Sequence, residues 1–204
     1  HAVTFAAGMA KGGLKPCVAI YSTFLQRSYD QIIHDVCMPQ LPVVFALDRS
    51  GVVGEDGETH QGVFDIAYLS HIPGMTVLAP SCKEELIEMM HFAFKLNRPC
   101  AIRYPKGRVP KDVWAPGAPL EYGKSRAIQK GEETVILSVG ACLEEAMEAA
   151  RVMELLGKKP TVVDARFVAP LDETGILELL NNHKYMITVE DHVYTGGFGM
   201  QVAA

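Results

Sequence analysis

Polar residues that are able to do chemistry follow three of the apolar, strand-like runs in this chain. Tyr21 and Arg27 flank the turn after residues 16–22, residues 48–62 form a long polar segment, and Arg103 ends a third apolar run. Ligands of open parallel sheets bind at the carboxyl ends of the strands, where loops lead into helices. We therefore expect these three segments to lie close together.

Segment 48–62 (DRSGVVGEDGETHQG) is rich in glycine and shows no hydrophobic period. A loop of this length is usually functional, although a plain solvated loop remains an alternative. Arg49 offers a planar fork of donors that suits phosphate or carboxylate. Asp56 and His60 are suited to hydrogen bonding and proton transfer.

The other two segments have simpler interpretations as well. The pattern after residues 16–22 favours a helix start capped by Thr23 and Gln26, with Phe24 in the core. An arginine that ends an apolar strand, as Arg103 does, often extends to water. Beside Arg49, however, Arg103 suggests a clamp for a phosphate group.

Short β-branched runs alternate with stretches of helical periodicity, which predicts a parallel sheet covered by helices on both faces. Ser81 and Glu84 form a predicted capping box. We expect strands at 16–22, 42–48, 75–81, 99–105, 134–140, 159–167 and 185–191, and helices at 23–37, 83–97, 142–157 and 172–183.

A segment rich in proline and glycine interrupts this alternation and reads as a surface linker. It predicts two three-layer α/β units with mostly parallel sheets, at 1–105 and 121–204, joined by residues 106–120. Both units look truncated, because residues 1–11 resemble a helix without a start signal and residues 200–204 a helix without a body. The glycine run at 196–199 is interpreted as a tight turn.

Composition excludes several classes of protein. The net charge of −5 argues against a nucleic-acid-binding domain. We find neither an apolar run long enough to cross a membrane nor a signal peptide. The five cysteines are scattered and form no CxxC pair, which fits reduced thiols in a cytoplasmic protein.

Several longer motifs give the chain a specific resemblance. YSTFLQRSYDQ (21–31), DRSGVVGEDGETHQG (48–62), IRYPKG (102–107) and TVEDHVYTGGFG (188–199) resemble segments of the 1-deoxy-D-xylulose-5-phosphate synthases. These are thiamine-diphosphate enzymes of the transketolase superfamily. The likeness extends along the whole chain and implies a pyrimidine-binding domain at 1–105, a linker at 106–120 and a C-terminal transketolase domain at 121–204.

The resemblance also implies a reaction, a cofactor and partners. Enzymes of this family condense pyruvate with D-glyceraldehyde 3-phosphate and release carbon dioxide, in the first step of non-mevalonate isoprenoid biosynthesis, which also supplies thiamine biosynthesis. Thiamine diphosphate carries the difficult chemistry. Phe24 matches the aromatic residue that stacks on the pyrimidine ring, and Tyr21 and Arg27 match polar groups around it. A homodimer through the pyrimidine-binding domain is implied as well.

On the substrate side, Arg49 and Arg103 match the arginines that hold the phosphate of glyceraldehyde 3-phosphate. Asp56 and His60 match the pair that meets the substrate's hydroxyl and carbonyl groups, and Tyr21 joins them as a third catalytic residue. Two guanidinium groups on the phosphate would orient the aldehyde carbon, and His60 would donate a proton toward the developing alkoxide.

Part of the family's pattern is absent from these 204 residues. The glutamate that activates the cofactor belongs two residues before His1, and the domain that binds the diphosphate and Mg²⁺ belongs further upstream. We therefore expect the chain to be inactive alone. Two alternatives stay open, namely a pyrimidine-binding subunit of a split transketolase or 2-oxo-acid dehydrogenase-like enzyme, and a non-catalytic dimerisation module.

Overall fold

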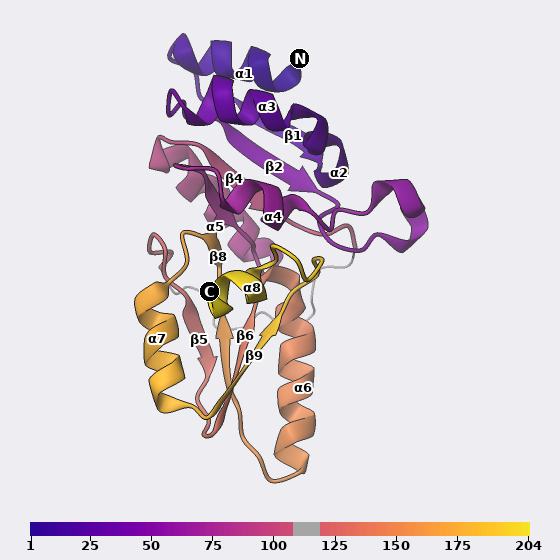
Figure 1. Cartoon of the computed structure of the whole chain (residues 1–204), viewed down its shortest axis with the longest axis vertical. Coiled ribbons are helices and arrows are strands. Elements are labelled where there is room, and N and C mark those ends of the chain that lie inside the picture. The colour runs from indigo at the N-terminus through magenta and orange to yellow at the C-terminus, as the bar shows by residue number, and fades with distance from the viewer. Residues whose placement is uncertain (108–118) are drawn as a thin grey trace.

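The computed structural model describes residues 1–107 and 119–204, which form two α/β units (Figure 1). The predicted linker at 106–120 falls mostly outside the described residues. Each unit contains its own sheet, as the alternating pattern predicts.

The first sheet has the strand order β1-β2-β4-β3-β8. Its first four members are parallel, and β8 pairs with β3 in the antiparallel sense. The strands are β1 (Cys17–Tyr21), β2 (Val44–Asp48), β3 (Thr76–Leu78), β4 (Cys100–Arg103) and β8 (Phe167–Ala169). Because β1, β2 and β4 are neighbours and parallel, their carboxyl ends share one edge of the sheet.

Helices cover both faces of this sheet. Phe45 and Leu47 of β2 pack into the core that includes α1 (Ala2–Lys11) and α4 (Asp65–Ser70), whereas Val44 packs against α5 (Lys83–Leu96) on the other face. This alternation follows from the two-residue period of a strand.

The helix predicted at 23–37 is not one regular helix. It divides into α2 (Ser22–Leu25), the 3₁₀ turn η1 (Gln26–Ser28), α3 (Tyr29–Gln31) and the π-helical η2 (Ile32–Cys37). The apolar spacing places Leu25, Ile32 and Val36 in the core correctly, but it does not distinguish the hydrogen-bond pattern along the backbone.

The predicted capping box before α5 is displaced by one residue. The Glu85 carboxylate, and not that of Glu84, accepts hydrogen bonds from the Ser81 backbone and hydroxyl, both at 2.8 Å. Cys82 therefore occupies the cap position without a side-chain bond.

The second sheet has the order β5-β7-β6-β9, with β5 antiparallel to the rest. Its helices α6 and α7 lie on opposite flanks of the sheet in Figure 1. The elements are β5 (Arg126–Gln129), β6 (Thr134–Ser138), η5 (Gly140–Cys142), α6 (Leu143–Leu155), β7 (Thr161–Asp164), α7 (Glu173–Asn182), β9 (Tyr185–Val189) and α8 (Phe198–Ala203).

The prediction of a single strand at 159–167 is wrong. Strand β7 ends at Asp164, the backbone of Arg166 has a positive φ of 57°, and the chain continues as β8 in the first sheet. Buried ion pairs accompany this crossing, since Arg166 Nε lies 2.9 Å from Glu85 Oε1 and Arg126 Nη2 lies 3.0 Å from Asp164 Oδ2. The two units are therefore joined by β8, which follows β7 in sequence but pairs within the first sheet, and by the buried Arg166–Glu85 ion pair.

Two further findings bear on sequence predictions. The turn at 196–199 is filled by the Glu190 carboxylate, which accepts hydrogen bonds from the backbone N–H groups of Phe198 and Gly199 at 2.7 and 2.8 Å. This is the tight turn that the sequence indicates. Within the described residues, no helix combines the length and the apolar character needed to span a bilayer.

Candidate active site at the strand ends

Three predicted site segments meet at the carboxyl edge of the first sheet. In the strand register, Tyr21 of β1 is opposite Asp48 of β2, and Leu47 of β2 is opposite Arg103 of β4. The backbone N–H of Ser50 donates to the Tyr104 carbonyl at 3.1 Å, so the two loops remain paired beyond the strands. The juxtaposition follows from the parallel order of β1, β2 and β4.

Three planar groups form a stack at this edge. The rings of Tyr21 and Phe24 are 5.2 Å apart between centroids and almost parallel, at 9°. The guanidinium carbon of Arg49 lies 3.7 Å from the Tyr21 ring centroid on a cation–π contact. His60 meets Phe24 edge-on, with centroids 5.3 Å apart. We call these four residues the ring shelf.

Phe24 is not a core residue. The simpler interpretation of the sequence placed it in the core behind a cap formed by Thr23 and Gln26, but 46% of its side chain is exposed. Thr23 Oγ1 donates instead to the Thr59 carbonyl at 3.3 Å, and α2 has no side-chain cap. The hydroxyl therefore ties the shelf to the long loop.

The long loop is ordered by its own contacts and is not merely solvated. Gly51 and Gly62 pair their backbones across its base at 2.8 Å. The Gln61 side chain accepts from the Val53 N–H at 2.7 Å and donates to the Gly57 carbonyl at 2.8 Å. These contacts hold two 3₁₀ turns, η3 (Gly54–Asp56) and η4 (Glu58–His60), beside the ring shelf.

Arg49 is held by carboxylates on two sides. Its Nε donates to Asp56 Oδ2 at 2.7 Å, and its Nη1 pairs with Asp48. Arg49 also has φ 58°, a left-handed backbone that a non-glycine residue rarely adopts and that is often found at functional sites. Lys106 Nζ donates to the other Asp56 oxygen at 2.6 Å. The hydrogen bonds from Lys106 and Arg49 lower the pKa of Asp56, which keeps it ionised.

His60 is available to a ligand. Its Nδ1 lies 2.9 Å from Thr59 Oγ1, an interaction that orients the ring, and the residue is only half-buried. An imidazole held by one nitrogen can donate or accept a proton at the other. Asp56 and His60 come from successive turns of the same loop, so the structure brings this predicted pair to the shelf.

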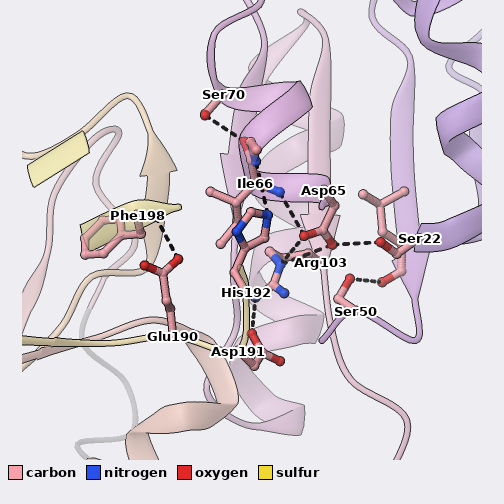
Figure 2. A network of polar contacts seen from close by, with 12 residues as sticks. Ser22, Ser50, Asp65, Ile66, Ser70, Arg103, Glu190, Asp191, His192 and Phe198 are labelled. Atoms are coloured by element: carbon pink, nitrogen blue, oxygen red, sulfur yellow. Dashed lines mark hydrogen bonds and ion pairs between the residues drawn. The ribbon is translucent and has the colours of Figure 1, made fainter. Parts of the chain in front are cut away.

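Arg103 lies in a different polar network, shown in Figure 2. Its guanidinium is almost fully buried, with Nε 3.1 Å from Asp65 Oδ1 and Nη1 2.7 Å from Asp191 Oδ1. Burial lowers its pKa, but the charges of Asp65 and Asp191 outweigh this effect and raise the pKa above its ordinary value. The predicted clamp is therefore not assembled in this structure. Arg49 and Arg103 have adjacent backbones, but their side chains bind different carboxylates.

Asp65 connects Arg103 to the ring shelf. The same carboxylate accepts from Ser22 Oγ at 3.0 Å and from the backbone N–H of Ile66 at 2.8 Å. Ser22 is the first residue of α2, the turn that carries Phe24. Asp65 is 1% exposed, and its negative charge is compensated by this set of donors.

The second unit contributes to the same network. Asp191 follows β9, and the neighbouring His192 Nε2 accepts from the Ala67 backbone N–H at 3.2 Å. Gln201 Nε2 donates to Ser70 Oγ at 2.9 Å. Asp191 and Asp65 are not among the site residues predicted from the sequence. Asp191 lies within the family motif at 188–199 and Asp65 lies at a helix start, but a one-dimensional pattern does not pair residues across units.

The remaining predicted residue, Arg27, has an exposed side chain in η1 and is not part of the ring shelf. The shelf itself fits a planar heteroaromatic ring, because Phe24 rests on Tyr21 by one face and keeps nearly half of its surface accessible. Among the described residues, no cluster of three or more His, Cys, Asp or Glu side chains is suited to a metal ion.

Comparisons with known proteins assign both units to a known family. The profile of the family "Transketolase, pyrimidine binding domain" matches residues 1–111, and that of "Transketolase, C-terminal domain" matches residues 123–204. The chain is 50% identical over 99% of its length to 1-deoxy-D-xylulose-5-phosphate synthase of Natranaerobius thermophilus, and 50% identical over 99% to that of Haemophilus ducreyi. In each case it covers 32% of the relative, so it spans about a third of these proteins.

Among solved structures, a split gene transketolase described as an inactive beta4 tetramer matches with a TM-score of 0.90 and 28% identity, over 98% of this chain and 65% of that one. A transketolase of Pichia stipitis matches with a TM-score of 0.75 and 19% identity, over 86% of this chain and 27% of that one, which supports the fold alone. With two transketolase domains matched in succession along almost its whole length, the chain belongs to the transketolase family.

Proposed function

We propose that this chain is part of a 1-deoxy-D-xylulose-5-phosphate synthase, which condenses pyruvate with D-glyceraldehyde 3-phosphate and releases carbon dioxide. The observation that carries the proposal is the 50% identity to such synthases along 99% of the chain, together with the ring shelf that the family's motif residues build. From the resemblance we also propose a homodimer, a cytoplasmic location and a supply of product to thiamine biosynthesis.

Within this proposal, the ring shelf holds the pyrimidine of thiamine diphosphate. Phe24 stacks on the ring, Tyr21 supports Phe24 from below, and Arg27 stays near the rim. Thiamine diphosphate, when bound, supplies the carbon nucleophile and electron sink that decarboxylation of a 2-oxo acid requires. We place the Mg²⁺ ion and the diphosphate outside the described residues.

The acceptor aldehyde then lies along the loop from His60 to Arg49. Arg49 and Arg103 bind its phosphate, which positions the carbonyl carbon by its far end. His60 donates a proton to the carbonyl oxygen as negative charge develops there. Asp56 accepts a hydrogen bond from a substrate hydroxyl. This bond replaces the one that Asp56 now accepts from either Arg49 or Lys106.

The experiment is a reconstitution. The isolated chain is assayed for 1-deoxy-D-xylulose 5-phosphate, alone and mixed with a separately produced N-terminal segment of a related synthase. That segment contains the diphosphate-binding domain and continues through the cofactor-activating glutamate. We expect no product from the chain alone and product from the mixture. A matched mixture with Phe24→Ala controls for background turnover. Product formed by the isolated chain would contradict the proposed division of the site.

A second candidate is a subunit of a split transketolase. The similarity to a split gene transketolase favours it, because that protein matches 98% of this chain with a TM-score of 0.90. Replacing pyruvate by a ketose phosphate donor, with an aldose phosphate present as the acceptor, separates the two functions in the reconstituted assay. Assembly of the mixture without either activity would instead support a dimerisation module.

A further inference from the structure

The Asp191 carboxylate occupies the space between Arg103 and the long loop. Its Oδ1 lies 2.7 Å from Arg103 Nη1. On the other side, a Cβ built on Gly51 would come within 1.9 Å of Asp191 Oδ2, so the carboxylate presses against the backbone two residues after Arg49. The place between the two arginine-bearing strand ends is therefore filled by an anion that the second unit supplies.

One hydrogen-bond donor of the Arg103 guanidinium has no partner among the described residues. This donor is Nη2, which is buried. A carboxylate that accepts only at Nη1 leaves this charged donor unsatisfied, which costs free energy. A phosphate group has three terminal oxygens and is able to accept from Nη1 and Nη2 together.

The two carboxylates on Arg103 differ in their access to solvent. The Asp65 side chain is 0% exposed and that of Asp191 is 23% exposed. Asp65 is also fixed by Ser22 and Ile66. An incoming anion therefore reaches the guanidinium by replacing Asp191, while Asp65 keeps the arginine in place.

We propose that Asp191 is a built-in stand-in for the phosphate of the acceptor substrate, and that the phosphate displaces it from Arg103. This inference rests on the phosphate subsite of the proposed function. Displacement reassembles the clamp predicted from the sequence, because it leaves Arg103 free to share one phosphate with Arg49. It also makes Asp191, in the C-terminal unit, a residue that determines specificity for phosphorylated acceptors.

The proposal predicts whether removal of the Asp191 charge strengthens or weakens phosphate binding. Asp191→Asn keeps a hydrogen-bond acceptor for Arg103 but removes the competing charge, so inorganic phosphate should bind more tightly. An interaction that merely tied the two units together would give the opposite sign, since its loss would loosen the site.

The test is a calorimetric titration of inorganic phosphate into the full 204-residue chain at low ionic strength. We expect Asp191→Asn to strengthen binding by about tenfold, the effect of one charge-assisted hydrogen bond. Asp30→Asn serves as the matched control, because it removes the same charge from a side chain that is 75% exposed, and it should leave the affinity unchanged. Thermal unfolding verifies that each variant is folded, and Asp191→Ser is the second variant.

Equal or weaker phosphate binding by both folded Asp191 variants would overturn the stand-in role. If Arg49→Ala and Arg103→Ala also weaken phosphate binding, the phosphate subsite is supported and only the proposed role of Asp191 is wrong. If phosphate binds none of these proteins, the subsite falls too. The cofactor part of the proposed function is then still tested separately by thiamine diphosphate binding at Phe24.

Discussion

The guanidinium of Arg49 lies over the Tyr21 ring, 3.7 Å from the ring centroid, and the same ring is stacked on Phe24. A guanidinium group and two aromatic rings are thus in contact within one stack. The position of the arginine depends on the ring beneath it, and the ring is supported by Phe24. A substitution of Tyr21 or Phe24 should therefore change the position of the Arg49 guanidinium.

The first prediction concerns this coupling. Tyr21→Leu removes the ring beneath Arg49, and we expect the affinity for inorganic phosphate to fall by about two- to fivefold, the value of a cation–π contact at a partly exposed site. Tyr21→Phe keeps the ring and should retain the wild-type affinity. A phosphate titration of the three proteins measures both effects, and equal affinities would show that the stack does not position Arg49.

The second prediction separates binding from stability with two phenylalanines. Phe24→Ala should weaken thiamine diphosphate binding by about three- to tenfold and change the free energy of unfolding by less than about 1 kcal/mol, because Phe24 is half exposed. Phe45→Ala, at a fully buried position, should lower the free energy of unfolding by about 3–5 kcal/mol.

Cofactor titration of the reconstituted enzyme and urea denaturation of the chain measure the two quantities. A large loss of stability in Phe24→Ala would place this residue in the core after all and contradict its assignment to the shelf.

A third prediction concerns Asp65. Asp65→Asn removes one of the two carboxylates from a buried arginine, and we expect the free energy of unfolding to fall by about 3–5 kcal/mol. Ser22→Ala removes a single neutral donor to the same carboxylate and should cost about 1 kcal/mol. Urea denaturation compares the two variants. Similar small losses in both would mean that Asp191 alone compensates Arg103.

The fourth prediction is a pH dependence of stability. Burial, followed by the negative charge of Glu85, raises the pKa of Asp164 to about 7. A carboxyl whose pKa is higher in the folded state binds its proton more tightly there. Its contribution to stability is therefore fully present below the unfolded value near 4 and is lost as the pH rises through about 7.

The stability of the wild-type chain should consequently decline relative to that of Asp164→Asn between pH 4 and pH 8. Melting temperatures of both proteins across this range measure the difference. Burial raises the pKa of Asp172, but hydrogen bonds from Lys124 and Ser125 outweigh this effect and lower the pKa below its ordinary value. Its contribution to stability therefore has the opposite pH dependence and is lost as the pH falls. A constant difference between wild type and Asp164→Asn would contradict the shifted pKa.

The sequence alone determined the local elements and the edge at which the site lies. The helical spacing of apolar residues predicts the bounds of α5 and α6 to within a few residues, and the short apolar runs predict the positions of β1, β2 and β4. Once these strands are parallel neighbours, Tyr21, Arg49 and Arg103 must come to the same edge, because parallel strands end together. The motifs also carried the resemblance to the family.

Only the tertiary structure decided which charges meet. Arg103 is paired with Asp65, 38 residues away, and with Asp191, 88 residues away in the other unit. Strand β8 joins the first sheet although its neighbours in sequence belong to the second. Local periodicity reports which face of an element is buried, whereas a buried ion pair depends on how distant segments pack and on which of several carboxylates then lies closest.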